Sequence, residues 1–182
     1  MKRRQALKIS SIGAIGLTAS ISSGCSKNTY FFHHGVASGD PLNDRVILWT
    51  RVTPQQAGPL EAILEISENK NFSSIIFSKK LQTSSLSDYT IKYDFLAKQY
   101  CDSDMGFFYR FRAGNAISDT GHSKTFSENT ITAKIGIFSC SNFPAGYFNA
   151  YQAAAEKNNL DLWLHLGDCL LYTSDAADDV VG

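Results

Sequence analysis

Two residues with metal-binding side chains follow two apolar segments late in the sequence. Cys140 comes directly after residues 134–139, and Asp168 follows residues 160–166 and Gly167. A thiolate and a carboxylate that lie next to each other repel unless a cation lies between them. These residue types therefore predict a metal site, provided that the fold brings Cys140 and Asp168 together.

The segment that carries both residues has the pattern of a strand, a helix and a second strand. Residues 134–139 and 160–166 are short apolar runs, and residues 147–157 place apolar side chains on one helical face. A βαβ unit of about thirty residues implies a parallel strand pair with a right-handed crossover. Ligands of such sheets lie beyond the carboxyl ends of the strands. We therefore expect Cys140 and Asp168 to be neighbours in space.

The longer segment before this unit has the pattern of β-structure. Runs of β-branched and aromatic residues alternate with turn clusters, and residues 109–112 alternate apolar and basic side chains with the period of a half-buried strand. About seven strands at such spacing predict an antiparallel β-sandwich of the immunoglobulin or fibronectin type. The expected strands are 31–37, which is broken by residues 38–41, then 45–52, 60–66, 74–80, 89–95, 107–113 and 123–126.

The first 25 residues have the pattern of an export signal. Residues 1–8 are basic, residues 9–23 carry no charge, and the uncharged run is short for a membrane span. Arg3 and Arg4 resemble the twin-arginine signal; a generic basic amphipathic terminus is the alternative. Cys25 follows small residues, so it is a candidate for a lipid anchor, whereas a plain signal is the alternative. We expect an exported protein, periplasmic or extracellular, that meets the membrane only through the signal or Cys25.

Charge and cysteine content exclude some other classes. The 17 basic and 17 acidic side chains cancel, so nothing indicates a nucleic-acid-binding module. Of the four cysteines, Cys101 is expected to be a partly exposed thiol, and we expect no framework of structural disulfides. His33 and His34 are adjacent in an expected strand, so they face opposite ways and do not suggest a shared metal. The sequence does not indicate an oligomeric state.

Several motifs resemble the PhoD-like (alkaline phosphatase D) family. Residues 35–41 and 46–51, Gly-Val-Ala-Ser-Gly-Asp-Pro and Val-Ile-Leu-Trp-Thr-Arg, are very similar to the opening of its N-terminal domain, and residues 107–114 are similar to a later strand. Residues 138–151 and 165–168 closely resemble the start of its catalytic domain. The resemblance implies metal-dependent hydrolysis of phosphomonoesters or phosphodiesters. It also implies that the βαβ unit begins an α/β metallophosphoesterase domain.

The resemblance further implies a division of the chain. Residues 1–25 would be the export signal, 30–127 the N-terminal β-sandwich domain and 131–168 the start of the metallophosphatase domain. The segment 169–182 resembles the translation of a sequencing-library adapter, and we expect it to be artefactual.

Roles for individual residues also follow from the resemblance. Cys140 would bind Fe(3+) as a thiolate, and Asp168 would bridge the iron to Ca(2+). The alternatives are a small buried apolar residue for Cys140 and a turn or helix cap for Asp168. His165 faces away from Asp168 in an alternating strand and is expected to support the site rather than bind metal. No catalytic side chain and no other cofactor-binding residue is assigned.

The sequence departs from the family pattern after Asp168. The family carries a tyrosine ligand three residues later, where this chain has Leu171, and its remaining ligands lie far downstream. A two-stranded parallel sheet cannot bury both its faces. We therefore expect this fragment to be inactive, with its second domain unfolded or held against the first.

Two other hypotheses remain open. An extracytoplasmic fibronectin-like binding module without catalysis predicts nothing special at Cys140 and Asp168. A different metal-dependent hydrolase on a similar sheet predicts a metal site but another substrate.

Overall fold

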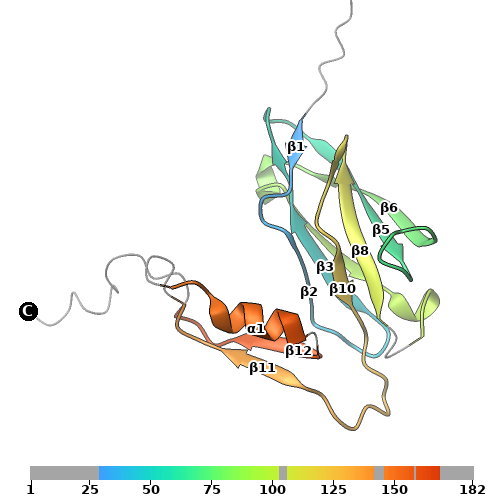
Figure 1. Cartoon of the computed structure of the whole chain (residues 1–182). Helices are drawn as coiled ribbons and strands as arrows, with labels where there is room; N and C mark the ends of the chain where they lie inside the picture. The colour runs from blue at the N-terminus through green and yellow to red at the C-terminus, as the bar shows by residue number, and fades with distance from the viewer. Residues whose placement is uncertain (1–28, 103–105, 142–145, 158, 169–182) are drawn as a thin grey trace, which may run out of the picture.

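Most of the described chain is antiparallel β-structure (Figure 1). The computed structural model describes residues 29–102, 106–141, 146–157 and 159–168. Its strands before residue 130 are β1 (Tyr30–Phe31), β2 (Val36–Gly39), β3 (Val46–Arg51), β4 (Thr53–Pro54), β5 (Leu60–Ser67), β6 (Ile75–Thr83), β7 (Thr90–Phe95), β8 (Phe107–Ala113), β9 (Ala116–Ile117) and β10 (Gly121–Ser123). Two short 3-10 helices, η1 (Ser85–Ser87) and η2 (Ala97–Gln99), connect strands.

Two antiparallel sheets share one core. One sheet has the strand order β2-β3-β7, and the other has the order β10-β8-β5-β6 with β9 beside β8. A small additional pair joins β1 to β4. Buried side chains from both sheets form a single apolar cluster. We refer to these two sheets and their core as the β domain.

The alternation of side chains explains how each strand faces this core. In β8, Phe107, Tyr109, Phe111 and Ala113 are buried, whereas the residues between them, which include Arg110 and Arg112, are only partly covered. Removing each large apolar side chain from water stabilises the fold by about 1.5–3 kcal/mol. The alternation that predicted this strand therefore also determines which face of it is buried.

Tyr109 shows how closely the β domain is packed. A Cβ atom added to Gly121, the partner of Tyr109 across the sheet, would lie 2.2 Å from the Cζ atom of its ring. Burial raises the pKa of Tyr109 to about 12. Glycine at position 121 is therefore required by the close approach of this ring.

Two expected strand boundaries were wrong. The expected strand 31–37 is two strands, because a turn at residues 33–34 and the positive φ of Gly35 (63°) separate β1 from β2. Strand β2 continues through Ser38 and Gly39, and the break falls at Asp40, which has a φ of 53°.

The other error concerns the last strand of the β domain. The strand expected at 123–126 is β10, which ends at Ser123 instead of beginning there. Ser123 pairs with Phe107, the first residue of β8, so later residues have no partner in this sheet.

A strand–helix–strand unit follows the β domain. It consists of β11 (Ile135–Phe138), α1 (Asn149–Lys157) and β12 (Leu162–His165), and α1 lies over one face of the strand pair (Figure 1). The pair is parallel, with Ile135 opposite Leu162 and Phe138 opposite His165. The predicted order of elements and the parallel pairing are confirmed. No helix among the described residues is long and apolar enough to cross a membrane.

One ion pair joins the unit to the β domain. Lys124 Nζ lies 2.5 Å from Asp161 Oδ1, and the backbone N–H of Lys134 donates to Asp161 Oδ2 at 2.6 Å. Both charged side chains are less than a third exposed. The hydrogen bond from Lys124 and, to a smaller extent, that from the Lys134 N–H hold the pKa of the Asp161 carboxyl below its ordinary value. Asp161 thus connects the β domain, β11 and the start of β12.

Candidate metal centre

Backbone hydrogen bonds hold the loops of Cys140 and Asp168 together. The Leu166 N–H donates to the Phe138 carbonyl oxygen at 2.8 Å, which extends the pairing of β11 and β12 beyond the strands. The Cys140 N–H then donates to the carbonyl oxygen of Gly167 at 3.2 Å, and the Ser141 N–H donates to that of Asp168 at 2.8 Å. The expected proximity of the two residues is found, whereas metal binding by them stays a prediction.

Both candidate ligands have an unusual backbone conformation. Cys140 has a φ of 56° and Asp168 a φ of 58°, and Gly167 between β12 and Asp168 has a φ of 106°. Residues other than glycine rarely adopt this left-handed region, and each such residue costs on the order of 1–3 kcal/mol. The same positive φ also occurs at Asp40, Phe72, Asp88, Tyr89 and Phe148, so it describes how the two loops turn and does not by itself indicate a function.

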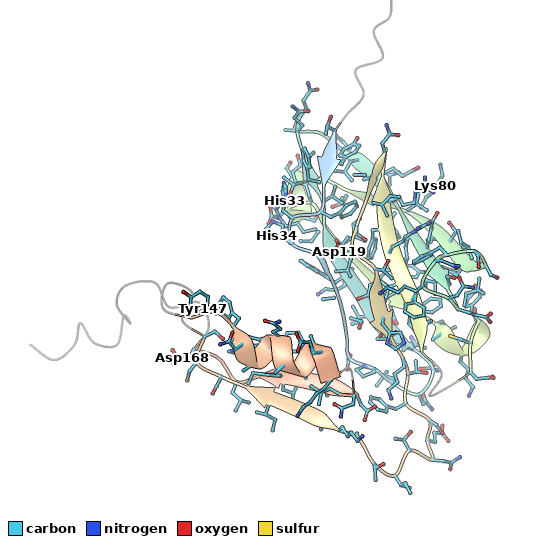
Figure 2. The ribbon with its side chains drawn as sticks, viewed as in Figure 1. His33, His34, Lys80, Asp119, Tyr147 and Asp168 are labelled. Atoms are coloured by element: carbon cyan, nitrogen blue, oxygen red, sulfur yellow. The ribbon has the colours of Figure 1, made fainter. Side chains whose placement is uncertain are left out.

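The two side chains are accessible to a ligand. Cys140 and Asp168 are exposed, and neither side chain has a hydrogen bond or ion pair to another described residue. Figure 2 shows Asp168 at the end of the unit that lies away from the β domain. A cavity of about 190 Å³ lies beside Cys140, between the end of β11 and the start of α1.

The donor types fit a metal centre in part. A thiolate suits iron, and a carboxylate suits calcium or bridges two cations. Within the described ranges, no group of three or more His, Cys, Asp or Glu side chains comes together. If the two residues bind metal, they would supply only part of the ligand set that a dinuclear centre needs.

His165 lies between the two loops rather than beside the candidate ligands. The ring is half-buried; its Nδ1 atom accepts a hydrogen bond from the Gly167 N–H at 3.1 Å, and its Nε2 atom lies 3.2 Å from Ser141 Oγ. Ser141 Oγ also bonds the hydroxyl of Tyr151 on α1. This placement agrees with a supporting role for His165.

Sequence reasoning missed Ser141 and Tyr151 as partners of this histidine. One signal was available: Phe138 and His165 are opposite each other in the parallel pair, so they share the face that α1 covers. The hydroxyl of Ser141 has no sequence pattern that would indicate its partners.

Tyr147, just before α1, is 91% exposed and lies at the same end of the unit as Asp168 (Figure 2). The histidines and the other cysteines of the sequence lie away from this site or outside the described residues. His33 and His34 are on the β domain, far from Asp168 (Figure 2), and His34 bonds Arg51 at 3.0 Å. Cys101 is a half-buried free thiol, and burial raises its pKa. Cys25, the signal 1–25 and the segment 169–182 lie outside the described residues.

The fold and the site together define a class of protein. An antiparallel β domain precedes a parallel strand–helix–strand unit, and a cysteine and an aspartate meet at the carboxyl ends of its strands. The chain matches the model of the PhoD-like phosphatase N-terminal domain over residues 18–127 and that of the PhoD-like phosphatase over residues 135–181. The chain belongs to the PhoD-like phosphatase family. The second match extends across most of the segment 169–182, so the artefact hypothesis for that segment stays a prediction.

Individual relatives agree with this assignment. Alkaline phosphatase D of Bacillus subtilis (strain 168) is 32% identical over an alignment of 155 residues that covers 78% of this chain and 25% of the relative. A solved structure of PhoD superposes with a TM-score of 0.65 at 28% identity, over 74% of this chain and 27% of the other. The chain thus spans about a quarter of the length of these relatives.

Proposed function

We propose that the protein to which this chain belongs hydrolyses phosphate monoesters or diesters, as an enzyme of the alkaline phosphatase D type. The main support is the pair of backbone hydrogen bonds that joins the loops of Cys140 and Asp168 at the carboxyl ends of two parallel strands. Membership of the PhoD-like phosphatase family supports the reaction class.

The proposed cofactors are Fe(3+) and Ca(2+). Cys140 would hold the iron through its thiolate, and Asp168 would contribute carboxylate oxygens to both ions. Bound metals polarise phosphoryl oxygens and provide an activated oxygen nucleophile. The chain itself contributes a fixed spacing of the two loops and an exposed thiol and carboxylate. Because these are two of several ligands that such a centre needs, we propose that this fragment alone is inactive.

The β domain is proposed to be a fibronectin-like sandwich. The chain passes from one sheet (β2, β3) to the other (β5, β6), returns to the first at β7 and ends in the second at β8 and β10, and this path supports a two-layer sandwich. The domain division at about residue 130 and the α/β metallophosphoesterase identity of the second part belong to the same proposal.

Activity and metal content test the proposed function. Genomic sequencing beyond codon 168 is expected to recover a longer reading frame. The longer protein that it encodes should bind iron and cleave bis-p-nitrophenyl phosphate, whereas the 182-residue chain should not. In the longer protein, Cys140→Ser should lower both iron content and activity at least about 100-fold. Cys101→Ser is the matched control, because this second free thiol lies in the β domain and should have little effect.

Two results would decide against the proposal. A longer protein that binds no metal and cleaves neither monoesters nor diesters would favour a fibronectin-like binding module. Retained iron binding without phosphoester cleavage would favour another metal-dependent hydrolase.

The proposed location is outside the cytoplasm. The basic and then uncharged pattern of residues 1–23 supports export, and Cys25 is the proposed lipid attachment site. Incorporation of labelled palmitate that is lost in Cys25→Ala would support the anchor. Equal labelling of the two chains would exclude attachment at Cys25.

A further inference from the structure

One imidazole ring contacts both loops that carry the candidate ligands. The Nδ1 atom of His165 faces the N–H of Gly167, the residue before Asp168. Its Nε2 atom faces the hydroxyl of Ser141, the residue after Cys140. Each contact is therefore one residue away from a candidate ligand, and the ring connects the two loops without occupying the site.

The backbone contact determines which nitrogen carries the proton. The N–H of Gly167 can only donate, so Nδ1 must accept, and a neutral ring then carries its proton on Nε2. Nε2–H donates to Ser141 Oγ, and the Ser141 hydroxyl is free to donate to the oxygen of Tyr151. The imidazole ring, the Ser141 hydroxyl and the Tyr151 hydroxyl thus all have hydrogen-bond partners when each proton is donated in this one direction.

The surrounding aromatic rings hold the imidazole in this orientation. Tyr151 stacks against His165 with ring centroids 6.1 Å apart and planes 13° apart, and it stacks against Phe138 at 4.9 Å. Tyr151 belongs to α1, so the helix restrains the ring and the hydroxyl of Ser141 together.

Ser141 has a reason to keep these partners. Ser141 is 6% exposed, and it is the most buried of the described residues between 135 and 168. A buried hydroxyl that loses its hydrogen bonds costs about 1–3 kcal/mol. The cost of misplacing Ser141 therefore keeps His165 in place between the loops.

We propose that His165 is a positioning residue that sets the spacing between the loops of Cys140 and Asp168 through its hydrogen bonds to Ser141 and Gly167. Its importance for hydrolysis rests on the proposed function, whereas the hydrogen bonds themselves do not. The ring acts through the backbone on either side of the site and not on the reacting atoms.

The test uses the 182-residue chain, so it does not depend on activity. Nitrogen-15 NMR at alkaline pH, where an imidazole is neutral, should show the His165 proton on Nε2. Hydrogen exchange should show a protected Gly167 amide. His165→Phe keeps a stacking ring but no hydrogen bond, and it should speed this exchange at least about tenfold, the equivalent of about 1.4 kcal/mol.

Two near-isosteric variants separate hydrogen bonding from packing. The Asn side-chain oxygen can replace Nδ1, so His165→Asn should keep the Gly167 amide protected to within about twofold. The Gln amide nitrogen can replace Nε2 instead, so His165→Gln should leave Gly167 as unprotected as in His165→Phe. His33→Asn, at an exposed histidine of the β domain, is the control and should change nothing at Gly167.

The proposal is overturned by any of several results. These are full protection in His165→Phe, equal exchange in the Asn and Gln variants, a proton on Nδ1, or a Gly167 amide that is unprotected in the unmodified chain. In the longer protein, His165→Phe should lower kcat about 10–100-fold with little change in KM. A longer protein that lacks all phosphatase activity would contradict the proposed function but leave the NMR and exchange results standing.

Discussion

The β domain and the strand–helix–strand unit are held together by different interactions. Every large side chain that is fully buried in the described residues belongs to the β domain. In the unit, α1 has no buried residue, and Ile137 and Leu164 are 64% and 44% exposed on the sheet face opposite α1. The unit instead depends on backbone pairing, on the hydrogen bonds around His165 and on the contact of Asp161 with Lys124.

This difference separates stability from function within one chain. The β domain carries the hydrophobic core, whereas the candidate ligands lie in the region with little apolar burial of its own. Apolar burial is the largest favourable contribution to folding, so we expect the β domain to unfold cooperatively and the unit to open at a lower free energy. Three predictions test this comparison.

The largest effect is expected in the core of the β domain. Phe111 is fully buried in β8, and Phe111→Ala should lower the free energy of unfolding by about 3–5 kcal/mol. Ile137→Ala is the matched change in β11 and should cost less than about 1 kcal/mol, because its side chain is already largely in water. Urea unfolding followed by tryptophan fluorescence measures both. Equal losses would show that the unit is as well packed as the β domain.

A glycine substitution in the β domain should have an intermediate effect on stability, and a glycine in β11 offers the comparison. Gly121→Ala should destabilise the β domain by about 1–3 kcal/mol, because the new methyl group meets the buried ring of Tyr109 at 2.2 Å. Gly136→Ala in β11 meets Leu160 Cδ1 at 2.6 Å and the edge of the Phe138 ring at 3.1 Å, but Leu160 is 38% exposed and the end of its side chain can move. We expect a change within about 0.5 kcal/mol. Thermal unfolding of the two variants should therefore differ clearly, and similar shifts in Tm would contradict the comparison.

The smallest effect concerns the contact between the two regions. The pKa of Asp161 is lowered in the folded chain, chiefly by the hydrogen bond from Lys124. A carboxyl whose pKa is lowered by folding stabilises the folded chain above its ordinary pKa of about 3.9. This stability is lost as the pH falls through the pKa of the folded state. The unit should therefore separate from the β domain only in acid, and small-angle scattering should show the molecule extend. Asp161→Ala should show the extended form at neutral pH; a compact variant would mean that other contacts hold the two regions together.

The sequence predicted much of the fold because alternation is a local property. Strands β3, β5, β7 and β8 lie close to their expected ranges, since each has one face in the core. The end of β10 was not predicted, because it depends on where its partner strand β8 begins and not on its own residues. The turn before Gly35 was missed because it separates two strands that pair with different partners, β1 with β4 and β2 with β3.

The candidate site was predicted only to the level of its backbone. Topology alone places Cys140 and Asp168 at adjacent strand ends, because parallel strands end at the same edge of a sheet. A supporting role for His165 was expected, but its partners could not be predicted, because Ser141, Tyr151 and the imidazole ring meet only after α1 packs on the sheet.

The hydrogen bonds from Cys140 to Gly167 and from Ser141 to Asp168 also set an order of events during protein synthesis. Cys140 leaves the ribosome twenty-eight residues before Asp168. At about 5–20 residues per second, its loop waits roughly 1.5–6 s for the partner strand. Until then, the backbone hydrogen bonds that join the loop of Cys140 to Gly167 and Asp168 cannot form. A nascent chain therefore brings Cys140 and Asp168 together only after all the residues of the β domain have been made.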